Sequence, residues 1–181
     1  MKTKAAIPAA TLALLTLLGA ASLPAAQAVS AHRRHHASAP TRSWPVVRRG
    51  DEDGPNGNIT LIQYLLRAKG FPVVVDGTFG LQTEQQVRRF QQASGLPSTG
   101  RVAGSTWRAL IVPLHLGSRG DAVRAAQDFL KEVSASPVPQ DGFYGPRTER
   151  AVRAFQRDSG LPVTGAVGPS TWLQMTEDIY D

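Results

Sequence analysis

Apolar side chains recur at intervals of three and four residues in six stretches of the chain, which is the spacing of one face of an α-helix. Residues that begin or end helices stand at the edges of these stretches. Asn58 is the expected N-cap of the first, Gly70 and Gly95 follow the first and second, and Pro146 and Pro169 occupy first turns. The pattern predicts an all-α fold with helices at about residues 58–69, 82–94, 121–133, 146–158 and 169–177. A short helix that starts near Ser105 or Thr106 and includes Ile111 completes the six.

One long segment of the sequence occurs twice with substitutions. Residues 76–100 read DGTFGLQTEQQVRRFQQASGLPSTG and residues 141–165 read DGFYGPRTERAVRAFQRDSGLPVTG, with 15 identities in 25 positions. The agreement continues into the first and third helices of each half, so it indicates a duplication rather than chance. We therefore expect two tandem modules of three short helices each, at 44–112 and 113–181.

Upstream of the first helix the two copies differ in length. The tripeptide Arg-Gly-Asp occurs at 49–51 and again at 119–121. Placing the tripeptides opposite each other makes the first copy six residues longer, with a surface insertion between Asp51 and Ile59. Gly and Asp suit the entry to a helix, and this explanation is favoured over adhesion to animal cells, which the tripeptide would also fit.

The repeated apolar side chains of the second and third helices form the expected core. They lie on one stripe of each helix, and each aromatic side chain contributes about 2–3 kcal/mol when it is buried. The rings could instead stack on sugar faces, but their position on the stripe favours the core. The expected core residues are Val87, Phe90, Trp107, Val152, Phe155 and Trp172.

Residues 1–43 are predicted to lie outside the two modules. Lys2 and Lys4 precede an apolar run over 9–23 and a small-x-small triplet at 26–28, which is the pattern of a cleaved signal peptide over 1–28. An uncleaved anchor is the alternative, although the run is short for a bilayer span. Residues 29–43 hold few large apolar side chains, so we expect a disordered basic linker and an exported protein.

Composition and charge disfavour most catalytic and cofactor classes. The chain has no cysteine, which excludes thiol catalysis. His115 is the only histidine after residue 36, too few for a zinc site with three histidines, and Asp76 and Asp141 stand beside turn glycines without a partner carboxylate. After the leader, 18 Lys and Arg are interspersed with 14 Asp and Glu, which disfavours nucleic acid. We expect no catalytic residue, metal, cofactor, nucleic-acid partner or membrane insertion of the mature chain.

The repeated motif resembles a known family. It reads Ile/Val-x-x-x-Gln-x-x-Leu, then Asp-Gly-x-Phe/Tyr-Gly-x-x-Thr-x-x-x-Val-x-x-Phe-Gln, then Gly-Leu-Pro-x-Thr-Gly-x-Val-x-x-x-Thr-Trp, and is similar to the bacterial peptidoglycan-binding domain of the three-helix type. The resemblance covers about 44–112 and 114–176 and implies a helical module that binds the cell wall. The insertion before the first helix departs from the pattern. Ser98-Thr99-Gly100 and Val163-Thr164-Gly165 also depart from it, because many members carry an acidic residue before the glycine.

Residues that the core does not need are the candidates for contact with the wall. The pairs Glu84–Arg88 and Glu149–Arg153 recur in both copies and could contact carboxylates or amides of the stem peptide. A surface helix pair of about 0.3–0.5 kcal/mol is the favoured explanation. The loop before the second helix differs between the copies, and an exposed aromatic ring beside an arginine would offer a stacking face and a carboxylate fork. The candidate peptidoglycan-binding residues are Thr78, Phe79, Gln82, Gln85, Phe143, Tyr144, Arg147 and Arg150.

These observations favour a secreted, wall-associated protein without catalytic activity that binds peptidoglycan, with anionic wall polymers as a further partner. Two alternatives stay open. One is a small wall hydrolase with an unrecognised active site, and the other is an adaptor that docks a separate hydrolase.

Overall fold

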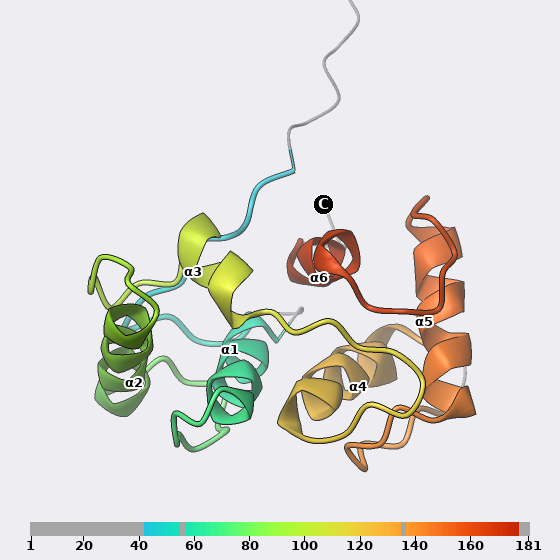
Figure 1. The fold of residues 1–181 in the computed structure, drawn as a ribbon, viewed down its shortest axis with the longest axis horizontal. Coiled ribbons are helices and arrows are strands. Elements are labelled where there is room, and N and C mark those ends of the chain that lie inside the picture. The colour runs from blue at the N-terminus through green and yellow to red at the C-terminus, as the bar shows by residue number, and fades with distance from the viewer. Residues whose placement is uncertain (1–41, 55–56, 135–136, 178–181) are drawn as a thin grey trace, which may run out of the picture. The chain divides into compact units, whose positions relative to one another are not determined.

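The computed structural model describes residues 42–54, 57–134 and 137–177 (Figure 1). Within these ranges the all-α prediction is confirmed, with two sets of three helices, and the helix ends agree with the sequence pattern to within two residues. The predicted signal peptide lies outside the described residues, as does the predicted linker except for Arg42 and Ser43. The helices are α1 (Asn58–Ala68), α2 (Leu81–Ala93), α3 (Gly104–Leu110), α4 (Asp121–Val133), α5 (Pro146–Asp158) and α6 (Pro169–Thr176).

A buried glutamine on each of four helices holds the loop that follows that helix. In α2, the Gln91 Oε1 accepts the backbone N–H of Gly100 at 2.9 Å. Its Nε2 donates to the Arg101 carbonyl at 2.7 Å and to the Thr106 hydroxyl at 3.0 Å. The same three bonds recur with Gln63 in α1, Gln127 in α4 and Gln156 in α5.

The four loops share one eight-residue pattern, in which the second residue is glycine and the eighth is threonine. The loops read DGTFGLQT at 76–83, TGRVAGST at 99–106, DGFYGPRT at 141–148 and TGAVGPST at 164–171. The second-position glycines have φ between 70° and 74°, a conformation that a side chain disfavours. Each module is therefore two helix–loop–helix units that share their middle helix, so the duplication is fourfold at the level of the loops.

The six expected core side chains are all buried, at 8% exposure or less. In the first module Trp107 stacks on Trp44 with ring centres 5.5 Å apart, and its indole N–H donates to the Pro45 carbonyl at 2.9 Å. In the second module Trp172 donates in the same way to the Val112 carbonyl at 2.7 Å. The segment that precedes the first helix of each module is thus bonded to the last helix of that module.

The start of α1 corrects one expectation, because Asn58 is not the N-cap. Gly57 occupies the cap position, and the carboxylate of Asp53 accepts the backbone N–H of Thr60 at 3.0 Å and the Thr60 hydroxyl at 2.5 Å. Asn58 lies inside the first turn, where its side-chain amide donates to the Thr176 carbonyl at 3.2 Å. A carboxylate reached through the preceding loop therefore caps the helix in place of the adjacent asparagine.

The two Arg-Gly-Asp tripeptides are not equivalent, which corrects the register expected upstream of α1. The backbone bridge between Arg119 and Phe143 corresponds to the bridge between Glu52 and Thr78, so Arg119 matches Glu52, 67 positions earlier. The buried glutamines of α1 and α4 are 64 positions apart. The first copy is therefore longer by three residues rather than six, and the extra residues fall between Asp53 and α1.

Helices α1 and α4 pack against each other and connect the two modules (Figure 1). The Nε atom of Arg67 in α1 lies 3.0 Å from Oδ2 of Asp121, the first residue of α4. The bond from Asn58 to the Thr176 carbonyl adds a polar contact between α1 and α6. All six helices belong to one compact unit, so the modules meet through a packed helix pair as well as through the chain between them.

We expect Gln91→Leu to lower the free energy of unfolding by about 2–3 kcal/mol, because leucine leaves the buried N–H of Gly100 and the Thr106 hydroxyl without a partner. Urea unfolding followed by circular dichroism measures the loss. The matched control is Gln92→Leu, at an exposed position one residue further along α2. Equal losses in the two variants would contradict the role given to the buried amide.

The loop aspartates predict a dependence of stability on acid. The pKa of Asp76 lies below its ordinary value of 3.8, mainly because Gln63 donates to the carboxylate. The pKa of Asp141 is lowered mainly because the backbone N–H of Phe143 donates to it. A carboxyl group with a lowered folded pKa stabilises the fold above its unfolded pKa, and this contribution is lost as the pH falls through the folded pKa.

Unfolding midpoints in urea should therefore fall as the pH drops below about 4. In the Asp76→Asn, Asp141→Asn double variant the midpoint should change less between about pH 6 and pH 3 than in the parent protein. An unchanged dependence in the double variant would show that other groups carry the acid sensitivity.

Candidate functional site

Six of the eight residues expected to contact the wall reach the surface. They lie in the loops before α2 and α5 or in the first two turns of those helices, and their side chains are exposed or partly exposed. Their role in binding stays a prediction. These residues are Thr78, Gln82, Gln85, Phe143, Arg147 and Arg150.

The other two residues, Phe79 and Tyr144, are completely buried, so the expected exposure of Tyr144 is wrong. The Tyr144 hydroxyl donates to the Gly165 carbonyl at 2.8 Å, and burial raises the pKa of this phenol well above its ordinary value. The expected aromatic face is reduced to Phe143. The guanidinium of Arg119 lies over the Phe143 ring, 4.3 Å from its centre.

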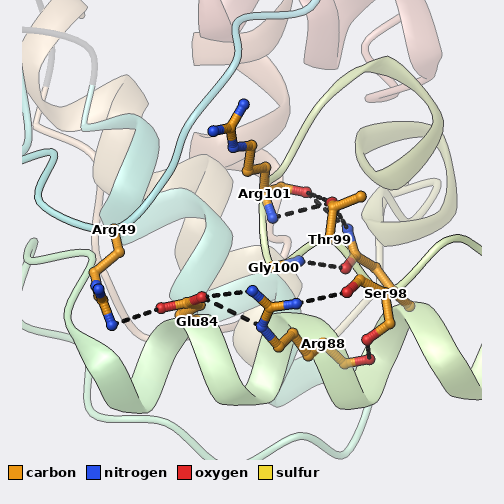
Figure 2. A network of polar contacts seen from close by, with 8 residues as sticks. Arg49, Glu84, Arg88, Ser98, Thr99, Gly100 and Arg101 are labelled. Atoms are coloured by element: carbon orange, nitrogen blue, oxygen red, sulfur yellow. Dashed lines mark hydrogen bonds and ion pairs between the residues drawn. The ribbon is translucent and has the colours of Figure 1, made fainter.

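The structure brings together a different set of residues in the first module. The segment before α1, the first two turns of α2 and the loop between α2 and α3 surround a hollow of about 250 Å³. Figure 2 shows the side chains of Arg49, Glu84, Arg88, Thr99 and Arg101 around this hollow. We call it the arginine pocket, and it is lined by Arg48, Arg49, Glu84, Arg88, Thr99, Gly100 and Arg101.

Glu84 lies between two arginines of the arginine pocket (Figure 2). Its Oε1 accepts from Arg88 Nε at 3.2 Å and from Arg88 Nη2 at 2.8 Å. On the other side, Arg49 Nη1 lies 3.2 Å from Glu84 Oε2. Arg88 also donates from Nη1 to the Ser98 carbonyl at 2.6 Å, so its guanidinium is held by both α2 and the following loop.

Gly100 allows Arg88 to lie this close to the loop. A Cβ atom at position 100 would come within 2.9 Å of Arg88 Nε, which is too close for a non-bonded contact. The N–H of Gly100 is bonded to the buried Gln91, so the wall of the pocket continues directly into the core. The same glutamine that holds the fold therefore sets the position of one side of the pocket.

Positive charge exceeds negative charge in the arginine pocket, because four arginines surround one carboxylate. Arg49 and Arg88 are paired with Glu84. The guanidinium groups of Arg48 and Arg101 form no ion pair with any residue that the structure describes, and Figure 2 shows the Arg101 side chain extending away from Glu84. Unpaired guanidinium groups are well suited to bind carboxylate or phosphate.

The second module keeps the central ion pair but not the arginines around it. Arg153 donates to Glu149 Oε1 from Nε at 3.2 Å and from Nη2 at 2.9 Å. It also donates to the Val163 carbonyl at 3.1 Å. Three other residues stand where the first module has Arg48, Arg49 and Arg101: they are His115, Leu116 and Ala166.

Arg48 and Arg49 were missed in the sequence because of the register error upstream of α1, whereas Arg101 already stood opposite Ala166 in the repeat and was not considered. With the two tripeptides opposite each other, Arg49 matches Arg119, and the copies look alike at this point. The bridge register places Leu116 opposite Arg49 instead. Comparison of the two copies in that register marks positions 48, 49 and 101 as arginines that the second copy does not repeat, and this is the signal that the sequence contains.

The described part of the chain contains no group of three His, Asp or Glu side chains placed to hold a metal ion. Nor does any helix in that part have the length and apolar character to cross a membrane. The loop aspartates bond to their own loops, since Asp76 Oδ1 accepts the Thr78 N–H at 3.0 Å and Asp141 Oδ1 accepts the Phe143 N–H at 2.8 Å. Their carboxylates therefore serve the turn.

Comparison with known proteins gives a consistent family. The chain is 35% identical over 105 residues to N-acetylmuramoyl-L-alanine amidase CwlM of Mycobacterium tuberculosis, covering 51% of this chain and 26% of the relative. It is 28% identical over 153 residues to N-acetylmuramoyl-L-alanine amidase CwlL of Bacillus licheniformis, covering 65% and 42%. An uncharacterized protein of Kitasatospora aureofaciens is 46% identical over 57 residues, covering 31% and 48%.

The chain thus spans less than half the length of each of these relatives. The family described as a peptidoglycan binding domain matches residues 55–110 and 119–175. These two ranges coincide with the two sets of three helices and the loops that the buried glutamines hold. The chain belongs to the peptidoglycan binding domain family, and it contains two tandem copies of that domain.

Proposed function

We propose that this chain is a secreted protein without catalytic activity that binds bacterial peptidoglycan through both modules. The observation that carries the proposal is the match of the peptidoglycan binding domain to 55–110 and 119–175, which includes most of the described chain. The described segments before α1 and α4 are bonded to the last helix of the module that follows, because the carbonyls of Pro45 and Val112 accept the indole N–H groups of Trp107 and Trp172. Nearly all of the described residues therefore belong to the two modules or are bonded to them.

The amidases among the relatives are longer than this chain, which spans 26% and 42% of their lengths. We attribute the hydrolysis in their names to the parts that this chain does not match, and the attachment to the wall to the shared modules. In the proposed function this chain supplies attachment alone. A separate hydrolase docked on it is the competing role.

The packing of α1 on α4 supports simultaneous use of both modules. A second site held close to the first binds the same polymer as an intramolecular event, which raises the overall affinity by about 10²–10⁴ when the geometry allows both sites to engage. Because the modules meet through packed helices, their binding faces would keep a defined relative direction. Weak contacts in each module would then suffice.

We expect the purified protein to sediment with insoluble peptidoglycan at about 0.15 M salt, the physiological ionic strength. The amount that stays in the supernatant measures the affinity. Peptidoglycan stripped of anionic wall polymers is the matched substrate, and equal sedimentation with both preparations is expected. Failure to sediment with either preparation would reject the proposal, and loss only after stripping would assign binding to the anionic polymers.

A gel that contains cell wall separates attachment from hydrolysis. We expect no clearing around the refolded band, because the proposed function includes no bond cleavage. Clearing would replace this function by that of a small hydrolase. Sedimentation that requires an added wall hydrolase would instead support the adaptor role.

Export is tested by the N-terminus of the protein recovered from the culture medium and the wall fraction of an expressing bacterium. We expect the recovered chain to begin at Val29, because residues 26–28 form the small-x-small triplet that a signal peptidase accepts. A chain that keeps Met1 and stays in the cytoplasm would contradict secretion.

A further inference from the structure

The arginine pocket of the first module has two features that its own residues leave unsatisfied. Arg48 and Arg101 form no ion pair with the residues that the structure describes. In addition, the buried Oε2 atom of Glu84 accepts no hydrogen bond from them. Arg49 lies 3.2 Å from this oxygen, close enough for an ion pair but without the alignment of a hydrogen bond. The pocket thus combines free cations with one oxygen that lacks a donor.

The ion pair between Arg49 and Glu84 can be replaced by contacts to a ligand. The Arg49 side chain is 61% exposed, whereas that of Glu84 is 17% exposed and is also fixed by two bonds from Arg88. An exposed ion pair is worth little in water, so Arg49 can turn to a ligand at small cost. Such a movement uncovers Oε2 of Glu84 while Arg88 keeps the carboxylate in place.

The size of the pocket limits what can occupy it. Its volume of about 250 Å³ is just below the range of roughly 300–1,000 Å³ that is usual for small-molecule sites. A disaccharide with its substituents would exceed this space. The end of a chain, with one small residue inside the pocket and the rest in solvent, fits it.

A peptide C-terminus has the chemistry that satisfies both features. Its carboxylate accepts from guanidinium groups, and the amide N–H two bonds away from that carboxylate carbon can donate to Glu84 Oε2. A phosphodiester has the charge but no N–H beside it. A sugar hydroxyl can donate but carries no charge to pair with the arginines.

We propose that the arginine pocket binds the C-terminal residue of a peptide, with its carboxylate on the arginines and its amide N–H on Glu84. The inference rests on the proposed function, in which the peptide is a stem peptide of peptidoglycan. It adds a specificity for free stem ends, which the proposed function does not require. The first module is then the one that distinguishes an intact free terminus from an amidated or cross-linked one.

The second module is an internal control, because the corresponding surface there has the same central ion pair and fewer arginines. It has the same ion pair, from Arg153 to Glu149, but neutral side chains at two of the three positions that carry arginine in the first module. Leu116 and Val163 are exposed there, at 54% and 42%. This surface lacks the charge to hold a carboxylate, so one carboxylate site per chain is expected.

Calorimetric titration of the whole mature protein tests the proposal with two synthetic stem peptides, one a C-terminal acid and the other the same peptide as a C-terminal amide. We expect the acid to bind at one site per chain and the amide to bind at least about tenfold more weakly, as for the loss of one charge-assisted contact. Backbone NMR signals of Gly100 and Arg101 should shift with the acid. Signals of the equivalent loop, at 165–166, should not.

The variants Arg49→Ala and Arg101→Ala should each weaken binding of the acid by about tenfold. The matched control is Arg89→Ala, which removes the same charge from an exposed position on α2 outside the pocket. It should bind the acid as the parent protein does. Equal weakening by Arg89→Ala would show that net charge alone is responsible and would overturn the proposal.

Transfer of the arginines to the second module provides a gain of function. In the double variant Leu116→Arg, Ala166→Arg we expect a second carboxylate site, seen as two peptides bound per chain and as new shifts at 165–166. A stoichiometry that stays at one would contradict the assignment of specificity to these positions. Circular dichroism checks that each variant keeps its helices.

The outcomes separate this inference from the proposed function. Sedimentation with peptidoglycan combined with equal binding of acid and amide would overturn the inference and keep the function. Inorganic phosphate that binds as tightly as the acid would also overturn it, because the site would then recognise charge without the amide. Loss of sedimentation together with binding of the free acid would reject the function and keep the carboxylate site.

Discussion

The amide side chain of one buried glutamine per loop is the interaction on which this fold depends. Such an amide both donates and accepts, so a single side chain pairs the glycine N–H, the next carbonyl and a threonine hydroxyl of the following helix. Without the glutamine the glycine N–H would lose its partner in every loop, at a cost of about 1–3 kcal/mol where that group is buried. Four repeats of this arrangement connect the helices of a chain that has no disulfide.

The same arrangement explains why the residues shared by the two copies give little information about the ligand. The Asp-Gly and Thr-Gly pairs, the following buried residue and the threonine are all used by the loop and the core. Side chains at the rim are free to differ, and they do. The first module surrounds its Glu84–Arg88 pair with Arg48, Arg49 and Arg101, whereas the second surrounds the equivalent pair with mostly uncharged groups. A common framework thus supports two surfaces of different chemistry.

Packing against each other stabilises small modules. A unit of about 60 residues buries only about 60% of its unfolded surface and is marginally stable alone. The contact of α1 with α4 increases the burial of both modules, and the ion pair from Arg67 to Asp121 lies at this contact. The contact that stabilises the modules therefore also relates their surfaces, which links stability to the use of two sites on one polymer.

The sequence by itself determined the helices, the duplication and the aromatic core. Helical periodicity, terminal glycines and prolines are local signals, and they placed every helix end to within two residues. A duplicated motif of this specificity also identified the family. These properties depend on neighbours along the chain, so a linear pattern contains them.

Only the tertiary structure decided the register before α1, the burial of Tyr144 and the existence of the arginine pocket. Each depends on residues that are distant in the sequence. Backbone bridges set the register, the Gly165 carbonyl accepts the Tyr144 hydroxyl, and the arginine pocket joins residues 48–49 to α2 and to residues 99–101. A pattern of exposed and buried positions cannot specify these long-range contacts, because the contacts are fixed by how the helices pack and by which loop groups need hydrogen-bond partners.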